Sequence, residues 1–324
     1  MNRNYKTSSI TESAMITGIL VIIAYLSSFF SVIMFFYPTP AIILAKRKGL
    51  KFASLSLVAS DIIISMLLGI QTGLVFFILY TPLAIALAYG ICKDKDANRT
   101  ILYGTASYMI SFVILIFLMD LIIGVNFLQQ LKDIYSESLD MMREMLNSYP
   151  DVLVNDRIEE MKKTIDEIGP MMISTISIMF PAVLIVSSVI TSYVNYLVAS
   201  KFAGRFKIKI KAHEGLGYFS FPKTFMVAMA AMLLVSYLMS ALNINVNAIQ
   251  INLFLIMFAA MYLQGIAYIK MYFIKRNLSK NMQTLMTFIV VFLSLFVFSG
   301  VSILITLLGL VDLTIDLRKL NKIV

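Results

Sequence analysis

Residues 129–170 read QQLKDIYSESLDMMREMLNSYPDVLVNDRIEEMKKTIDEIGP, and this polar stretch decides how the chain is organised. It is the only long water-soluble segment in a chain that is otherwise lipid-like. The stretch carries ten acidic residues against five basic ones, and it separates one block of hydrophobic segments from another. Because charged side chains are costly inside a bilayer, we expect these residues to project from the membrane.

The polar stretch has the pattern of two amphipathic helices. Apolar residues recur every three or four positions over 128–149, and Pro150 is expected to end this first helix. The same spacing recurs over 158–168, where Gly169-Pro170 is expected to end the second helix. The two apolar faces predict a helical hairpin outside the bilayer, which is either a solvated spacer or a lid or docking element.

The composition of the whole chain indicates an integral membrane protein. The chain is 60% hydrophobic and 14% charged, with a mean hydropathy of +0.87. A soluble domain is nearer half apolar and a quarter charged. The apolar runs are too long for strands and lack alternation, which excludes an outer-membrane barrel. We therefore expect an all-α, polytopic transmembrane helix bundle with eight or nine membrane segments.

The distribution of apolar runs predicts four parts along the chain. Residues 14–45 are uncharged, and as one helix they would be roughly 48 Å long, too long for one crossing of a ~30 Å core. Pro38 and Pro40 interrupt them, so we expect one crossing near 14–31 and a short second segment near 32–45. The parts are N-terminal membrane helices, the hairpin, C-terminal membrane helices and a polar tail, over 14–128, 129–170, 171–311 and 312–324.

The basic residues predict which loops lie in the cytoplasm. Lys and Arg concentrate in loops on the cytoplasmic side of a membrane, and here they mark 46–51, 92–100, 200–223 and 275–282. By parity, the loops 71–73, 129–170 and 243–248 lie on the other side. We expect a multi-pass protein of the bacterial inner membrane with 129–170 outside the cytoplasm, and the sides of both termini stay open. The net charge of +9 reflects these loops, so no nucleic-acid partner is expected.

Polar side chains inside the apolar runs are the candidates for a binding site. Asp61 lies near the centre of its run in SLVASDIIISM, and Asp120 lies nearer the end of its run in IFLMDLIIG. A carboxylate at such depth usually faces a protein interior or a polar cavity. The alternative is a hydrogen-bonded structural role between helices. The candidate ligand-binding residues are Asp61, Asp120, Asn126, Asn195 and Gln264.

The motifs that the sequence lacks argue against catalysis. There is no G-x-x-x-x-G-K-[ST] phosphate loop, no H-E-x-x-H and no G-x-S-x-G. A single Cys (Cys92) and a single His (His213) leave no disulfide framework and no zinc site. We expect no enzyme activity, no cofactor and no metal site.

Three short segments resemble the YybS family of bacterial membrane proteins, whose function is not established. They are PTPAIILAKRKGL at 38–50, GLGYFSFP at 215–222 and LLGLVDLTIDLRKL at 307–320. The resemblance covers nearly the whole chain. Pro222 matches the family pattern in the second segment, and Gly309, Asp312, Asp316 and Arg318 match its closing arrangement.

The YybS family is itself distantly similar to the substrate-binding S components of energy-coupling-factor transporters and to MreD-type morphogenesis proteins. In S components, small residues of the first helix pack on a partner membrane subunit. The resemblance therefore implies that role for Ala14 and Gly18, which form a small-xxx-small pair. It also implies that residues 14–128 are S-component-like and that an energy-coupling module is a possible partner.

These observations support a leading hypothesis and two alternatives. The leading hypothesis is a non-catalytic membrane subunit that binds a small ligand or a partner protein, with a dry cavity around Asp61 in the S-component-like version. One alternative is an MreD-like scaffold or regulator of cell-envelope processes, in which the hairpin docks another protein. The other is a carrier coupled to protons through Asp61 and Asp120. The sequence does not predict the oligomeric state.

Overall fold

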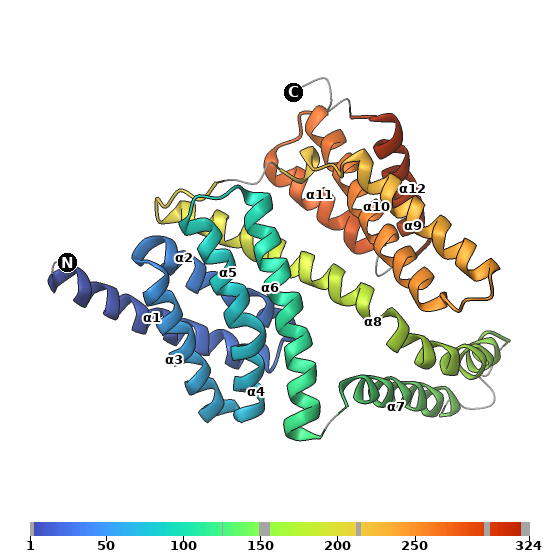
Figure 1. The fold of residues 1–324 in the computed structure, drawn as a ribbon, viewed down its shortest axis with the longest axis horizontal. Helices are drawn as coiled ribbons and strands as arrows, with labels where there is room; N and C mark the ends of the chain where they lie inside the picture. Colours follow the sequence, from blue (N-terminus) through green and yellow to red (C-terminus); the bar gives the residue numbers. More distant parts are fainter. Residues whose placement is uncertain (1–2, 125, 149–155, 212–214, 295–298, 319–324) are drawn as a thin grey trace. The chain divides into compact units, whose positions relative to one another are not determined.

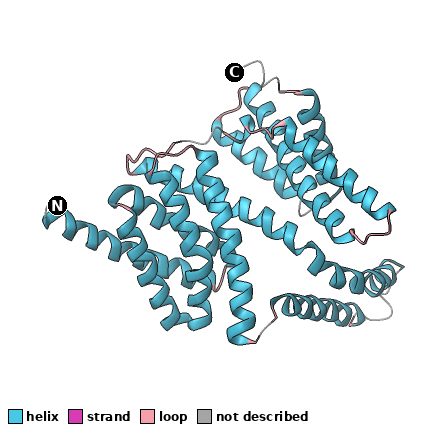
Figure 2. Ribbon diagram, viewed as in Figure 1, coloured by secondary structure: helices cyan, strands magenta, loops and turns pink. Residues whose placement is uncertain are grey.

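The computed structural model describes residues 3–124, 126–148, 156–211, 215–294 and 299–318 (Figure 1). Within these ranges every regular element is helical, which confirms the all-α fold class (Figure 2). Pro150 and His213 lie outside the described residues.

Seven of the described helices are long and apolar enough to cross a membrane. They span Thr7–Ser27, Leu50–Leu68, Ile70–Cys92, Ala97–Leu121, Ile158–Arg205, Lys223–Ala241 and Asn247–Lys275. A shorter apolar helix covers Gly300–Ile315. Together they agree approximately with the eight or nine segments expected from the sequence.

The chain forms two units, and the first comprises residues 1–177 and 187–213. Its elements begin with α1 (Arg3–Ser27), the 3-10 helix η1 (Ser31–Phe36), α2 (Pro38–Lys48) and α3 (Leu50–Leu68). They continue with α4 (Ile70–Val75), the π-helical η2 (Phe76–Tyr80), α5 (Thr81–Cys92), α6 (Ala97–Leu118) and the π-helical η3 (Met119–Ile123). α7 (Phe127–Asn147) and most of α8 (Asp156–Arg205) complete the unit.

The second unit comprises residues 178–186 and 214–324, so the middle of α8 belongs to it. Its other elements are η5 (Leu216–Tyr218), α9 (Lys223–Ala241), α10 (Asn247–Lys275), α11 (Lys280–Phe292) and α12 (Ser299–Ile315). The apolar run expected over 283–311 is thus divided between α11 and α12, and α12 begins beside Gly300.

The first apolar run turns back on itself, as its length predicts. Ser13 Oγ donates to the carbonyl of Phe52 and Thr17 Oγ1 to that of Ser56, both at 3.2 Å. Both pairs advance by four residues in the same direction, so α1 and α3 run parallel. The segment between them, η1 and α2, must therefore return across the unit, and Pro38 begins α2 at a position where proline is favoured.

The connection between α3 and α4 differs from the expected loop at 71–73. The chain turns at Gly69, whose φ of 95° lies in the left-handed region that favours glycine, and helical structure resumes at Ile70. Residues 71–73 are therefore helical. The polar pair Gln71-Thr72 predicted the approximate position of the connection, but the turn itself is at Gly69.

The expectation that Gly169-Pro170 ends the second hairpin helix is wrong, because α8 continues through both residues to Arg205. The side chain of Leu139 on α7 lies over Gly169, and a Cβ at this position would meet Leu139 Cδ1 at 2.8 Å. Gly169 therefore serves the close packing of α7 on α8. Tertiary packing outweighs the weak local tendency of Gly-Pro to end a helix.

Pro181 also lies inside α8, and a side chain from α10 bridges the backbone there. Asn252 Oδ1 accepts from the N–H of Ala182 at 2.7 Å, and its Nδ2 donates to the carbonyl of Ile178 at 2.6 Å. An uninterrupted α-helix would join these two backbone groups to each other. Asn252 thus holds the segment of α8 around Pro181 against α10.

The main apolar core lies in the first unit. Buried side chains from α1, α2, α3, η2, α5, α6 and α8 form one cluster, and η2 with α5 contributes the largest group. Large members of the cluster are Leu20, Ile42, Leu57, Ile64, Leu83 and Leu87. This core surrounds the first of two buried polar networks.

Candidate functional site

The first network is centred on Asp61, which is buried in the middle of α3. Tyr37 Oη donates to Asp61 Oδ1 at 2.6 Å, and Thr81 Oγ1 donates to Asp61 Oδ2 at 2.7 Å. Tyr37 Oη also lies 2.8 Å from Ser60 Oγ. Both carboxylate oxygens are thus bound by hydroxyl groups from other elements of the unit.

Local backbone features place these hydroxyl groups. Tyr37 lies between η1 and α2, directly before Pro38. Thr81 follows the π-helical turn η2 and precedes Pro82, which has no N–H to donate. π-Helical turns often occur at functional sites. Aromatic rings line this region, with ring centroids 4.6 Å apart for Tyr37 and Phe76.

Asn195 forms a second group of contacts beside α2. Its Oδ1 accepts from Thr39 Oγ1 at 3.1 Å, and its Nδ2 donates to the carbonyls of Phe35 at 2.8 Å and Thr191 at 2.9 Å. Asn195 therefore ties α8 to η1 and α2. Because Thr39 is two residues from Tyr37, the structure brings Asn195 and Asp61 to the same short segment.

Two further hydroxyl groups are buried in the first unit. Ser192 Oγ has no hydrogen-bond partner within the described part of the chain, whereas the Tyr80 hydroxyl interacts with that of Tyr108. The ring of Tyr80 packs against that of Tyr108, with centroids 6.0 Å apart. The interior of the first unit therefore holds free hydrogen-bonding capacity in addition to the saturated Asp61.

Asp120 and Asn126 lie away from these contacts. Asp120 is exposed on η3. Asn126 is the N-cap of α7, where its side chain accepts from the N–H of Gln129 at 3.0 Å. N-capping is a structural role, because it satisfies a backbone donor that the helix leaves open. Of the five candidates, the structure brings together Asp61 and Asn195.

The fifth candidate, Gln264, belongs to a network in the second unit. Gln264 Nε2 donates to Asp312 Oδ2 at 2.7 Å. Arg318 forms an ion pair with the same oxygen through Nε at 2.9 Å and Nη2 at 2.8 Å. All three side chains are buried. Asp312, Arg318 and Gln264 join α10 to α12 and the segment that follows it.

This network also fixes the chain around η5. Arg318 Nη1 donates to the carbonyls of Gly217 and Phe219, both at 2.7 Å. Gln264 Oε1 accepts from the N–H of Phe221 at 3.1 Å. The segment GLGYFSFP and the segment around Arg318, far apart in the sequence, therefore meet on α10.

Glycine positions explain how α10 and α12 approach so closely. A Cβ at Gly309 would collide with the carbonyl of Met261, and one at Gly265 with the carbonyl of Ile305. Small residues allow membrane helices to pack backbone against backbone. Pro222 is the N-cap of α9, and Asp316 follows α12 with a φ of 53°.

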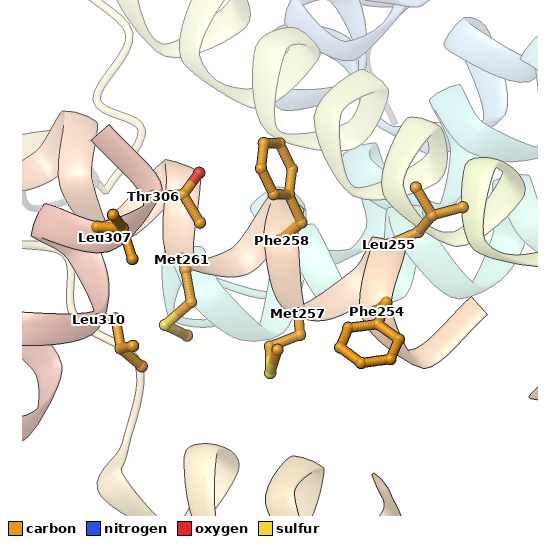
Figure 3. Close-up of a pocket in the computed structure, with 8 residues that line it drawn as sticks. All are labelled: Phe254, Leu255, Met257, Phe258, Met261, Thr306, Leu307 and Leu310. Atoms are coloured by element: carbon orange, nitrogen blue, oxygen red, sulfur yellow. The ribbon is translucent and has the colours of Figure 1, made fainter. Parts of the chain in front are cut away.

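The second unit also contains an apolar pocket of about 360 Å³ between α10 and α12 (Figure 3). Thr306 supplies the only side-chain oxygen among its lining residues, and that hydroxyl donates to the carbonyl of Ser302 at 2.8 Å. The lining residues are Phe254, Leu255, Met257, Phe258, Met261, Thr306, Leu307 and Leu310. This pocket belongs to the second unit, whereas the expected cavity was around Asp61 in the first.

Ion pairs gather several polar segments at one end of the first unit. Lys46 Nζ contacts Asp94 Oδ1 at 2.5 Å and donates to the carbonyl of Ile91 at 3.1 Å. This ammonium group holds the pKa of the Asp94 carboxyl below its usual value of 3.8. Glu12 also pairs with Arg47 at 3.3 Å and with Lys48 at 3.2 Å, and Asp96 pairs with Lys211 at 3.4 Å.

Sequence reasoning selected Asp61, Asn195, Gln264, Asp312 and Arg318 but not the hydroxyl groups that bind Asp61. Tyr37 and Thr81 each precede a proline, and this position is the only local signal that could have found them. Their distance from Asp61 in the sequence gave no indication of contact.

Together, the apolar helices and the buried polar networks define a multi-pass helical membrane protein. The family model of a predicted membrane protein (DUF2232) matches residues 15–313, so the chain belongs to that family. The chain is also 24% identical over 279 residues to the uncharacterized protein YybS of Bacillus subtilis (strain 168), covering 85% of this chain and 87% of that protein. The resemblance to the YybS family is confirmed. No solved structure matches the chain.

Proposed function

We propose that the protein is a non-catalytic subunit of a complex in the bacterial inner membrane and that it binds a partner membrane protein through α1. Ala14 and Gly18 are exposed on this helix, and nothing lies within 4 Å of a Cβ built at Gly18. Ser13 and Thr17 on the same helix point to α3. The face with Ala14 and Gly18 therefore stays open in the first unit.

The exposed Gly18 is the observation that carries this proposal. At Gly73, Gly104, Gly265 and Gly309, by contrast, an added Cβ would collide with a neighbouring helix. At these four positions glycine allows a neighbouring helix to approach closely, and Gly18 offers the same flat surface to a helix of another protein. The resemblance to S components makes an energy-coupling module the first partner to test.

Site-specific photo-cross-linking in intact cells tests this interface. Met15 on α1 and Phe117 on α6 are both 65% exposed, so p-benzoylphenylalanine at these two positions forms a matched pair. We expect an adduct with a specific membrane protein from position 15 and none from position 117. Adding Gly18→Leu should abolish the adduct. Equal adducts from both positions, or none from position 15, would contradict the proposal.

The orientation of the protein is part of the proposal. The N-terminal part of α1 and the basic segments 46–51, 92–100 and 200–211 share one end of the first unit through ion pairs. This grouping supports a cytoplasmic location for all of them, and we propose the same side for the N-terminus. In a Cys92→Ser background, a cysteine at Asp140 should react with a membrane-impermeant maleimide added to intact cells. A cysteine at Lys93 should react only after the cells are opened.

A second candidate function is small-ligand binding inside the first unit. The unpartnered hydroxyl of Ser192 favours it, because a ligand that supplies the missing hydrogen bond of a buried polar group is bound more tightly. Native mass spectrometry of the purified protein would detect a retained metabolite. Loss of that metabolite in Ser192→Ala, with the fold intact, would support ligand binding, and an unoccupied wild-type protein would argue against it.

A further inference from the structure

The hairpin of α7 and α8 is an antiparallel pair whose register is fixed by three contacts. Tyr135 Oη donates to Met172 Sδ at 3.1 Å, and the side chain of Leu139 lies over Gly169. Arg143 Nε donates to Asp166 Oδ1 at 2.9 Å. The α7 residue number rises as the α8 number falls, so the helices run in opposite directions. Their buried apolar contact is formed by Leu139, Leu146 and Ile165.

The α7 helix carries more apolar surface than this contact uses. Ile134, Met141 and Met145 are 55%, 62% and 61% exposed. Spacings of seven and four residues keep them on one stripe of the helix. On α8, Met161 and Ile168 are also seven residues apart, and both are more than two-fifths exposed. Each helix of the hairpin therefore has an open apolar stripe beside its buried one.

The two open stripes lie on the same side of the hairpin. Each residue turns an α-helix by about 100°. Around the axis of α7, Met141 and Met145 lie on one side of the buried stripe and Arg143 lies on the other side. Around the axis of α8, Met161 and Ile168 lie on one side of Ile165 and Asp166 lies on the other side. Because Arg143 and Asp166 bond to each other on one side of the pair, both apolar stripes face the other side.

We call this side the methionine face, formed by Ile134, Met141, Met145, Met161 and Ile168. Acidic residues border it on both helices. By the same rotation, Glu137 and Glu144 adjoin the stripe on α7, and Glu160 and Glu167 adjoin the stripe on α8. All four glutamates are exposed. Lys163 is the one described basic side chain paired with this border, and it lies 3.9 Å from Glu167.

We infer that the methionine face docks a cationic amphipathic helix of a partner protein. Methionine side chains are flexible and polarizable, so they adapt to the apolar residues of a bound helix. The two rows of glutamates would face Lys or Arg residues on either edge of that helix, and such complementarity selects the partner. The inference does not depend on the proposed α1 interface, because it concerns different helices.

The charge of the hairpin argues against a lipid surface as the occupant. Helices that lie on a membrane carry Lys and Arg on their polar face, because anionic lipids attract them. Residues 129–170 instead carry ten acidic and five basic residues in a chain whose net charge is +9. Anionic lipid headgroups would repel the four glutamates beside the methionine face.

A binding experiment with the full-length protein in zwitterionic nanodiscs tests the inference. The probe is a fluorescein-labelled amphipathic peptide of Leu and Lys, the comparison peptide contains Leu and Glu, and the signal of empty nanodiscs is subtracted. We expect saturable binding of the Leu/Lys peptide alone. Met141→Ser/Met145→Ser/Ile168→Ser should weaken it by about tenfold or more.

Charge reversal provides a matched control. Glu144→Lys/Glu160→Lys changes the border of the methionine face, and we expect binding of the Leu/Lys peptide to weaken by about tenfold. Asp140→Lys/Glu159→Lys makes the same change in net charge at exposed positions on the side of the pair that carries Arg143. This control should leave binding within about twofold of the wild type. Circular dichroism should show unchanged helix content in both variants.

Three outcomes would overturn the inference. The first is equal binding of the Leu/Glu peptide, and the second is equal weakening by both charge-reversal pairs. The third concerns a fluorophore attached to cysteine at position 141 in a Cys92→Ser background. If the fluorophore already reports an apolar environment without peptide, the bilayer or a second copy of the chain covers the methionine face.

Discussion

Replacing Arg318 should release the segment around η5 and destabilise the second unit. Arg318→Met leaves Asp312 as a buried carboxylate whose remaining described partner is Gln264, and it removes the donor to the carbonyls of Gly217 and Phe219. Breaking a buried ion pair by removing one partner costs about 3–5 kcal/mol. For a unit of this size, that loss corresponds to a decrease in apparent Tm of about 10–20 °C.

A double substitution separates the cost of the orphaned charge from the value of the pair. Asp312→Leu/Arg318→Met removes both charges, and buried pairs replaced by apolar residues often lose little stability. Asp312 Oδ1 makes no hydrogen bond within the described residues, so the native pair is itself incompletely satisfied. We therefore expect the double variant to unfold at a higher temperature than Arg318→Met alone.

Two measurements in detergent micelles check this prediction. Thermal unfolding gives the change in Tm, and limited chymotrypsin digestion reports release of the chain through cleavage after Phe219. Arg276→Met is the control, because Arg276 is exposed and its guanidinium lies over the Tyr272 ring at 5.2 Å. If Arg318→Met lowers the Tm no more than this control, or less than the double variant does, the assigned role of Arg318 is wrong.

Three further predictions concern other parts of the molecule. Gly309→Leu should prevent α12 from packing on α10, so size-exclusion chromatography should show loss of the folded monodisperse protein. Tyr37→Phe removes the donor to Asp61 Oδ1 and should lower stability by about 1–3 kcal/mol, measured by thermal unfolding. Lys46→Met should raise the pKa of Asp94, measured by carboxyl NMR, because Lys46 lowers it. Because the pKa of Asp94 is lowered, the stabilisation by the Lys46–Asp94 pair is fully present at pH values above 3.8, the usual pKa of Asp94. That stabilisation is lost as the pH falls through the lowered pKa.

Each of these three has a control at a position without the same contact. Gly300→Leu should be tolerated better than Gly309→Leu, because nothing lies within 4 Å of a Cβ at Gly300. Tyr25→Phe, at a half-exposed residue on α1, should change stability by less than Tyr37→Phe. Lys93→Met should shift the pKa of Asp94 less than Lys46→Met does. A control that matched its test variant would remove the basis of that prediction.

The sequence predicted the membrane segments because each depends on the composition of one continuous run. The turn at Gly69 and the course of α8 through Gly169-Pro170 differed from expectation for a common reason. Both are decided by conformation or packing that a local pattern does not contain: a left-handed φ at Gly69, and the contact of Leu139 with Gly169. A glycine or proline is a weak signal of a helix end when a neighbouring helix packs over it.

The candidate sites show the same limit. The burial of Asp61 could be predicted, because a lone acid in a long apolar run must face the protein interior. Its partners could not, since Tyr37 and Thr81 come from other elements of the chain. Arg318 was selected through a family pattern, and its contacts with Gly217 and Phe219 required the structure.

The bond between Arg318 and Gly217 has a consequence for biosynthesis. The ribosome must add 101 residues after Gly217 before Arg318 exists. At a synthesis rate of about 5–20 residues per second, the two carbonyls that Arg318 binds remain without this hydrogen-bond donor for about 5–20 s. A nascent chain stalled before Arg318 should therefore hold α10 already inserted but leave the preceding segment open to a co-translational chaperone or protease.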